Sequence, residues 1–360
     1  MVWTPPPARA GHPYYMHDAI YAQPGALRLV LRGNGEALAR ASAQLREAER
    51  VLLSGIGTSW HAALVGELLL ARAGRLGHRA RAFHSFEFQS YWPGPDPRTG
   101  VIVVSHRGTK RFSREALAKA KAGGGVGVAI TGKGSDLPPI ADVTLVTVEQ
   151  ERSAAHTVSY TCAMALLAAL AAGVGGNDDL LHQVEGIPDL MARLLGQESW
   201  DELAARFRDR HRYYFVGGGP NTATAYEAAL KMNEANHTTA IGLHCEQFLH
   251  GPWAAIDEED IMFVIAPPGP AYERCLAVAR VARDVGAPVV AIVEEGDREI
   301  AGLAAETITI PPVDELLSPI LAVVPLQLFT YHTALERRVN PDTMRADQPA
   351  HGRARAALQL

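Results

Sequence analysis

Short apolar runs alternate with longer segments along the first half of the chain, and glycine-rich or polar turns separate them. The runs are four to six residues long, which suits buried strands better than helices. The expected strands are 51–53, 101–104, 126–130 and 142–147. Helices are expected from about Thr58 and Ser113, and an apolar helix ends at Gly175. This alternation predicts a parallel sheet flanked by helices.

The same order of elements recurs in the second half. Strands are expected at 213–216, 261–266, 289–293 and 306–310, with helices from Asn221 and over 271–285 and 321–336. Corresponding strands are displaced by about 160 residues, which is the mark of an internal duplication. We therefore predict an α/β protein of two tandem subdomains. Each is a flavodoxin-like αβα sandwich around a parallel sheet, and the two span about 49–195 and 196–340.

The segments outside these two units have a different pattern. Residues 1–16 form a proline-rich arm without regular periodicity. From about Gln23 to Arg50, apolar residues recur at helical spacing among many charges, which predicts one long amphipathic helix beside the first subdomain. The arm and this helix make up residues 1–48, and residues 341–360 form a C-terminal tail.

Composition narrows the class of protein. The chain has 360 residues, of which 48% are hydrophobic and 20% charged, and its formal net charge is −5. This favours a globular protein and gives no reason to expect nucleic acid or an anionic membrane as partner. The three cysteines lack zinc-site spacing, so we expect neither a metal nor a cofactor. Without a signal peptide or a run of about 20 apolar residues, a cytoplasmic protein is expected.

The turn after the first strand carries the first candidate chemistry. Gly55-Ile-Gly57 is followed by Thr58 and Ser59 where a helix begins. Helix N-termini have unpaired amides and a favourable dipole, so this turn could hold a phosphate. An ordinary turn with a Thr or Ser cap is equally compatible with these residues. Trp60 stands where a dinucleotide fold would need its third glycine, which argues against that fold.

A second candidate is the loop that follows the strand 101–104. It combines two hydroxyls, a glycine and several basic groups, a set suited to an anionic oxygen cluster. Its residues are Ser105, His106, Arg107, Gly108, Thr109 and Lys110. A solvated basic loop is the alternative.

The first helix of the second half carries a charged face. Glu227, Lys231 and Glu234 lie at i, i+4 and i+7, so they share one side of a helix that is otherwise mostly apolar. Buried charges are costly unless they serve each other or a ligand, which favours a site over a solvated stripe. Further on, Gly251-Pro252 restrains the chain after His250, whose imidazole suits proton transfer near neutral pH.

Together these motifs resemble the SIS (sugar isomerase) family. Within it, the chain looks like the isomerase domain of glucosamine-6-phosphate synthases (glutamine–fructose-6-phosphate amidotransferases) without the glutaminase domain. The likeness runs from about Tyr15 to Pro349. The motifs that carry it are Gly57-Thr-Ser-Trp-His-Ala62, Ser105-x-x-Gly108, Thr161-x-Ala163, Glu227-Ala-Ala-Leu-Lys-x-x-Glu234, His250-Gly-Pro252, Val324-Pro-Leu-Gln-Leu328, Tyr331-His332 and Asp347-Gln-Pro349.

The resemblance implies a homodimer that binds a hexose or hexosamine 6-phosphate near the subunit interface. Glu234 would match the glutamate that moves a proton between C1 and C2, with Lys231 beside it. His250 would match the ring-opening histidine that the neighbouring subunit contributes. The tail would cover the active site. The expected substrate-binding residues are Gly57, Thr58, Ser59, Ser105, His106, Arg107, Gly108, Thr109, Lys110, Ser159 and Glu227.

Two departures from the family pattern affect the expected chemistry. The phosphate loop, usually rich in Ser and Thr, has His106, Arg107 and Lys110, which suggests added positive charge. The lysine that follows Asp-Gln-Pro in the family aligns with Ala354. Three functions stay open: a sugar-phosphate isomerase, aminosugar-phosphate deaminase or deglycase; a non-catalytic phosphosugar-binding regulator; and an ammonia-dependent or partner-fed glucosamine-6-phosphate synthase.

Overall fold

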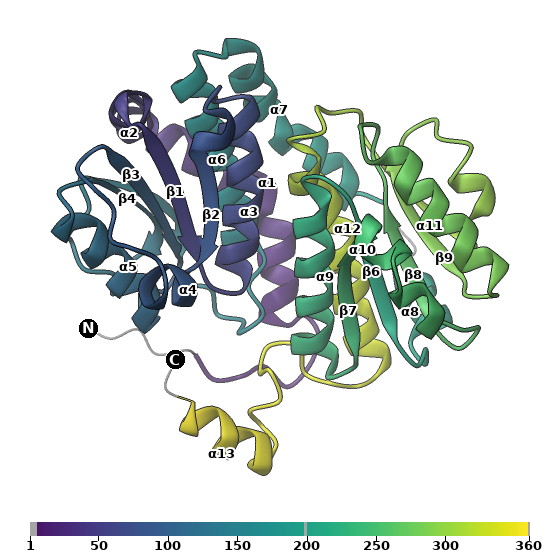
Figure 1. Ribbon diagram of the computed structural model, residues 1–360. Helices are drawn as coiled ribbons and strands as arrows, with labels where there is room; N and C mark the ends of the chain where they lie inside the picture. Colours follow the sequence, from purple (N-terminus) through teal and green to yellow (C-terminus); the bar gives the residue numbers. More distant parts are fainter. Residues whose placement is uncertain (1–5, 198–199, 359–360) are drawn as a thin grey trace.

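The computed structural model describes residues 6–197 and 200–358. It consists of two parallel five-stranded sheets, each covered by helices on both faces, which lie side by side (Figure 1). The fold class and the duplication predicted from the sequence are confirmed. Both sheets have the same topology, because each strand order is 2-1-3-4-5 when the strands of one half are numbered along the chain.

The first sheet has the order β2-β1-β3-β4-β5. Its strands are β1 (Arg50–Gly55), β2 (Ala80–His84), β3 (Thr99–Ser105), β4 (Val126–Lys133) and β5 (Val143–Glu149). The helices of this half are α3 (Thr58–Arg72), α4 (Ser85–Ser90), α5 (Arg111–Ala122) and α6 (Val158–Gly175). A single turn of 3-10 helix, η1 (Gly77–Arg79), precedes β2.

The second sheet has the order β10-β9-β8-β6-β7. Its strands are β6 (Tyr213–Gly217), β7 (Ala240–His244), β8 (Ile261–Ile265), β9 (Val289–Glu294) and β10 (Glu306–Ile310). The helices here are α9 (Asn221–Asn236), α10 (Cys245–Leu249), α11 (Tyr272–Asp284) and α12 (Ser318–Glu336), with short 3-10 turns η2 (Pro252–Ala255) and η3 (Ala301–Leu303). The edge strand β7 was not predicted; only Ala240 is buried among its five residues.

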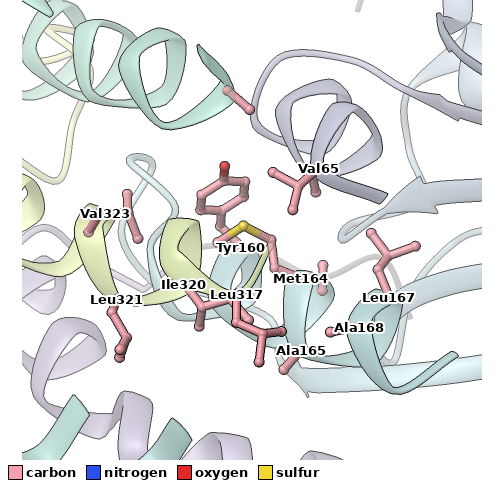
Figure 2. Close-up of a cluster of buried hydrophobic side chains, with 14 of the residues drawn as sticks. Val65, Tyr160, Met164, Ala165, Leu167, Ala168, Leu317, Ile320, Leu321 and Val323 are labelled. Carbon is pink, nitrogen blue, oxygen red and sulfur yellow. The ribbon is translucent and has the colours of Figure 1, made fainter. Parts of the chain in front are cut away.

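One hydrophobic core joins the two halves. Figure 2 shows Tyr160 and Met164 of α6 beside Ile320 of α12 and Leu317, which directly precedes that helix; all four are buried. By length and composition α6 is apolar enough to cross a membrane, but 89% of it is buried inside the protein. Its burial against both halves explains why the helix is apolar on every side.

The predicted single helix from Gln23 to Arg50 is wrong. The structure has two helices, α1 (Tyr15–Gly33) and α2 (Gly35–Glu47), which are separated at Asn34. The Asn34 side chain donates to the carbonyl of Val30 (2.7 Å) and exchanges two hydrogen bonds with the backbone of Val146 in β5 (2.7 and 2.8 Å). An asparagine that bonds a neighbouring strand competes with the helix, which explains the break.

The termini and the connection between the halves complete the chain. The arm predicted for residues 1–16 ends sooner, because α1 already begins at Tyr15, and residues 1–5 of that arm lie outside the described residues. The helices α7 (Asp178–Leu195) and α8 (Trp200–Phe207) connect the two sheets. In the tail, α13 (Pro349–Ala357) lies at the lower edge of the molecule in Figure 1.

Candidate active site

The turn after β1 is built for close backbone packing. Gly57 has φ +56° and ψ −128°, a conformation that L side chains rarely adopt. A Cβ at Gly55 would lie 2.3 Å from the backbone oxygen of Ser59. The first turn of α3 also uses its own amides, since Ser59 N–H donates to Ile56 (3.1 Å) and Trp60 N–H to Gly57 (2.8 Å). The Ser59 hydroxyl has no hydrogen-bond partner among the described residues, so it remains able to bind a ligand.

The start of α3 faces α9 of the other half. The Thr58 hydroxyl donates to one carboxylate oxygen of Glu227 (3.0 Å), and His61 Nδ1 donates to the other (2.6 Å). Glu227 is fully buried and His61 is nearly so. We expected the Thr58 hydroxyl to face a phosphate; the structure instead directs it toward the charged face of α9. The duplicated halves therefore share one polar site at their interface.

Lys231 lies at the centre of this site. Its ammonium group has three acceptors within reach: Thr58 Oγ1 at 3.2 Å, Glu227 Oε1 at 3.4 Å and Glu234 Oε2 at 2.5 Å. The Lys231 side chain is 2% exposed, that of Glu227 is 0% and that of Glu234 is 14%. The burial predicted for the charged face of α9 is thus found. Three protons meet three oxygens, so the buried cation is fully satisfied.

The pKa values of the two glutamates beside Lys231 are shifted in opposite directions. Burial raises the pKa of Glu227, but the charge of Lys231 and the hydrogen bonds from His61 and Thr58 outweigh it and leave that pKa below its ordinary value. Burial raises the pKa of Glu234, and the nearby Lys231 only partly offsets this. Two carboxylates whose pKa values are pushed apart are typical of acid–base sites. The lowered pKa of Glu227 favours its charged form, and the raised pKa of Glu234 makes it the group better suited to exchange a proton.

The loop 105–110 follows β3 but carries less charge than we expected. His106 is buried; its Nε2 accepts from the Glu151 backbone N–H (3.2 Å), so its proton lies on Nδ1, which contacts Thr147 Oγ1 (3.3 Å). Burial and the nearby charge of Arg107 lower the pKa of His106 to about 3. The imidazole is therefore neutral near pH 7. The expectation that His106 adds positive charge to the loop is wrong, because sequence alone does not reveal its burial.

This burial predicts a pH-dependent stability. In the unfolded chain His106 takes up a proton below its ordinary pKa of 6.5, whereas in the folded chain it does so only near its lowered pKa of about 3. The contribution of His106 is therefore complete above pH 6.5, and each pH unit below that value should remove roughly 1.4 kcal/mol. Chemical denaturation of wild type and His106→Gln at pH 7.5, 6.0 and 5.0 checks this. The variant should lose stability less steeply on acidification, and equal slopes would contradict a buried neutral His106.

The other cations of the loop lie near the acid–base residues and the tail. Burial lowers the pKa of Lys110, as do the charges of Arg107 and Arg355, whereas Glu234 raises it. The charge of Lys110 therefore interacts with Glu234 and with Arg355 of α13. Arg107 donates to the backbone carbonyl of Glu151 (3.3 Å). Among the loop residues, Thr109 is exposed and Ser105 is buried at the end of β3.

A small cavity of about 20 Å³ lies between the α3 turn, the loop and α6. Its lining includes Ser59, His106, Ser159 and Tyr160. This is room for about one water molecule, so a phosphate would require the surrounding side chains to move. The Tyr160 hydroxyl is buried without a hydrogen-bond partner among the described residues, and it points away from the apolar cluster in Figure 2.

His250 lies apart from this group. It follows α10, its side chain is 74% exposed, and its Nε2 lies 3.2 Å from Glu246 Oε2. The structure thus brings together residues from α3, α9 and the loop after β3, but it does not place His250 among them. In the part of the chain that the structure describes, no group of three or more His, Cys, Asp or Glu residues could hold a metal ion.

Three site residues were missed by the sequence analysis. Glu151 is a buried carboxylate that accepts backbone N–H groups from Thr157 (3.0 Å) and Ser159 (2.9 Å), and burial raises its pKa. Its position just beyond β5, at the carboxyl edge of the sheet, was the signal that could have identified it. His61 lies within the motif Gly57-Thr-Ser-Trp-His-Ala62 but was given no role, whereas Tyr160 carried no signal, because only the packing of α6 directs it toward the site.

Comparison with known proteins places this geometry in a family. A model of the SIS domain matches residues 44–173 and 206–337, which are the two halves described above. The glutamine–fructose-6-phosphate aminotransferase (isomerizing) of Thermococcus kodakarensis is 31% identical over 352 residues, which cover 94% of this chain. The enzyme of the same name from Thermus thermophilus is 33% identical and matches 92% of this chain. The chain spans 58% of the length of each relative.

Solved structures share the fold. The C-terminal domain of glucosamine-fructose-6-phosphate aminotransferase from Francisella tularensis superposes with a TM-score of 0.81 at 18% identity and covers 92% of this chain and 99% of its own. Tagatose-6-phosphate ketose/aldose isomerase from Escherichia coli superposes with a TM-score of 0.79 at 21% identity. The match covers 95% of this chain and 98% of the isomerase chain. Glucosamine-6-phosphate deaminase from Thermotoga maritima superposes with a TM-score of 0.71 at 20% identity. The match covers 91% of this chain and 97% of the deaminase chain.

Proposed function

The chain belongs to the SIS domain family, and from this premise we propose that it acts on a hexose or hexosamine 6-phosphate as an isomerase or deaminase. The observation that carries the proposal is the buried set formed by Glu227, Lys231 and Glu234 at the junction of the two halves. A module that only binds its ligand does not need a buried carboxylate with a raised pKa beside a paired lysine. The names of the relatives and of the structural neighbours support the substrate class.

In the proposed reaction Glu234 takes the proton from one of the two carbons C1 and C2 and returns it to the other. Lys231, held by Glu227 and Thr58, keeps Glu234 in place and offers positive charge where the enediol oxygen develops. Ser59 and Ser105 with the loop amides are the proposed phosphate ligands, and the charge of Lys110 interacts with that of Glu234. Gly57 and Gly108, both at positive φ, let the backbone of these turns approach the ligand.

His250 is proposed to act in a neighbouring subunit. Its side chain is exposed on the surface of the second half, as a residue contributed to a partner's site would be. Ring opening of the sugar by this imidazole, the homodimer and the cytoplasmic location stay predictions. The subdomain bounds 49–195 and 196–340 also stay predictions, as does a C-terminal tail that covers the site.

The test is exchange of the C2 hydrogen in deuterated water. The protein is incubated with a panel of glucose, fructose, tagatose and glucosamine 6-phosphates. NMR follows deuterium at C2 of the aldoses and at C1 of the ketoses, whose C2 bears no hydrogen. We expect exchange with at least one member, and thermal unfolding should show that the same sugar stabilises the protein by about 2–4 kcal/mol in large excess over its Kd. If sugars bind but none of them shows exchange, the proposal of an enzyme is rejected in favour of a phosphosugar-binding regulator.

Removing the Ser59 hydroxyl tests the phosphate end of the site. Ser59→Ala should weaken binding of the preferred sugar phosphate by roughly 10- to 100-fold, because a hydrogen bond to a charged group contributes about 1.5–3 kcal/mol. Isothermal titration calorimetry measures the change. Ser90→Ala, an exposed serine at the end of α4, is the matched control and should bind as wild type does. Unchanged affinity in Ser59→Ala would remove Ser59 from the phosphate site.

The relatives in the family also suggest a second candidate function, a glucosamine-6-phosphate synthase. Both are named glutamine–fructose-6-phosphate aminotransferase (isomerizing), and the chain matches 58% of their length. A deaminase also catalyses the reverse reaction, so formation of glucosamine 6-phosphate from fructose 6-phosphate and ammonia would distinguish both activities from a plain isomerase but not from each other. Glu234 would move the same proton in either direction of reaction.

A further inference from the structure

Two of the three cysteines meet at the carboxyl edge of the second sheet. Cys245 directly follows β7 and Cys275 lies in the first turn of α11. The Cys275 sulfur lies 3.7 Å from the carbonyl oxygen of Ile265, the last residue of β8. The last residues of β7 and β8 both pair with Gly217 of β6. The two cysteines therefore lie near the same point of the sheet. Both side chains also border Gly218: a Cβ there would lie 2.9 Å from the Cys245 sulfur, and the Gly218 backbone interacts with the Cys275 thiol.

The Cys245 side chain also borders a cavity. This cavity of about 280 Å³ lies between α3 of the first half and the loops at the carboxyl edge of the second sheet. Its rim includes the exposed Arg72 and Arg274, whereas Cys245 lies at its buried end. A reagent as small as hydrogen peroxide therefore has a route to this sulfur. Nothing in the proposed sugar-phosphate reaction uses this cavity.

The surroundings of Cys245 favour the thiolate. The hydrogen bond from Cys275 and that from the backbone N–H of Glu246 outweigh burial and the charge of Glu246, and they lower the pKa of Cys245 to about 7. Arg274 lies close enough for its guanidinium to interact with the Cys245 charge. The pKa of Cys275, in contrast, is raised by Cys245, by burial and by the charge of Glu315. Cys245 is thus the attacking thiol and Cys275 the resolving one.

We propose that Cys245 and Cys275 form a reversible disulfide on exposure to hydrogen peroxide. The Cys245 thiolate attacks one peroxide oxygen, the O–O bond breaks, and sulfenic acid and hydroxide result. The Cys275 thiol then attacks the Cys245 sulfur: the S–S bond forms, the S–O bond breaks, and the sulfenic oxygen leaves as water with the proton of Cys275. Two thiols and one peroxide thereby yield one disulfide and two waters. The sulfurs must approach to about 2.05 Å, so α10 and α11 move together.

The third cysteine provides an internal control. Cys162 is buried in α6, and burial together with the charge of Glu151 raises its pKa. It lies in a different hydrophobic cluster from the pair. Cys162 should therefore stay reduced under conditions that oxidise Cys245 and Cys275.

The test counts free thiols by mass. The full-length protein is treated with peroxide near pH 7.5, denatured, alkylated with iodoacetamide and weighed. Untreated protein should take up three labels, one for each cysteine. Oxidised protein should take up one label and have lost about 2 Da through the disulfide. Dithiothreitol before alkylation should restore all three labels.

Variants identify the partners. Cys162→Ser should lose both of its labels on oxidation, as the pair predicts, whereas Cys245→Ser should keep both of its labels. Cys275→Ser should leave a sulfenic acid on Cys245 that dimedone captures. Wild-type protein that keeps three labels, forms only higher oxides, or links two chains would overturn the proposal. The wild-type count decides this even if a variant fails to fold.

Discussion

Glu234→Gln is expected to reduce C2-hydrogen exchange by roughly 10²- to 10⁴-fold, the range that a positioned proton-transfer group contributes. Glutamine keeps the size and the hydrogen-bonding oxygen of Glu234, so its contact with Lys231 can persist, but its amide cannot accept the carbon-bound proton. Binding of the sugar phosphate should change little. Single-turnover exchange followed by NMR, with affinity measured in parallel by calorimetry, separates the two quantities.

The pH dependence of the wild type provides a second readout of the same residue. Because burial raises the pKa of Glu234, the exchange rate should fall as pH decreases through that raised value, where the carboxyl holds its proton. Glu115→Gln is the matched control, since Glu115 forms an exposed pair with Arg111 on α5. This control should exchange like wild type. An unchanged rate in Glu234→Gln would reject Glu234 as the base while leaving the binding site intact.

Lys231→Met is expected to destabilise the folded state by about 3–5 kcal/mol, because it leaves buried carboxylates without their cation. Glu227 is fully buried and would keep only the hydrogen bonds from Thr58 and His61. Methionine fills a similar volume, so the loss reports the missing charge rather than a cavity. Urea denaturation at pH 7.5 gives the free energy of unfolding. The loss should shrink at lower pH, where the unpaired carboxylates can take up protons.

An exposed ion pair serves as the control for this experiment. Lys133 pairs with Glu149 at 2.6 Å, and both side chains are largely exposed. Lys133→Met should therefore leave the free energy of unfolding nearly unchanged, because water screens such pairs. If Lys231→Met is as stable as Lys133→Met, the charges on α9 do not depend on one another for their burial, and the acid–base assignment loses its basis.

Several parts of the fold could be predicted because they depend on local pattern. The apolar runs before Gly55 and Gly217 are short and bounded by glycine, so they mark β1 and β6. The spacing of Glu227, Lys231 and Glu234 places them on one face of α9 without reference to any other element. The apolar composition of its neighbours was sufficient to predict that this face is buried.

Other features depend on contacts between distant segments. The break at Asn34 follows from its bonds to Val146, which lies in a strand more than a hundred residues further along the chain. The neutral state of His106 follows from its burial beside Thr147 and the Glu151 amide. Neither contact leaves a trace in the local sequence, because a polar residue has the same sequence pattern whether it faces solvent or a buried partner.

The sequence by itself determined the duplicated α/β architecture, the positions of the glycine turns and the charged face of α9, because side-chain periodicity and turn chemistry are local properties. Only the tertiary structure decided that the Thr58 turn and the α9 face form one site. Thr58 and His61 reach Glu227 across the junction of the halves, through hydrogen bonds between residues more than 160 positions apart. The different pKa shifts of Glu227 and Glu234 arise from that junction, since burial and neighbouring charge are properties of packing.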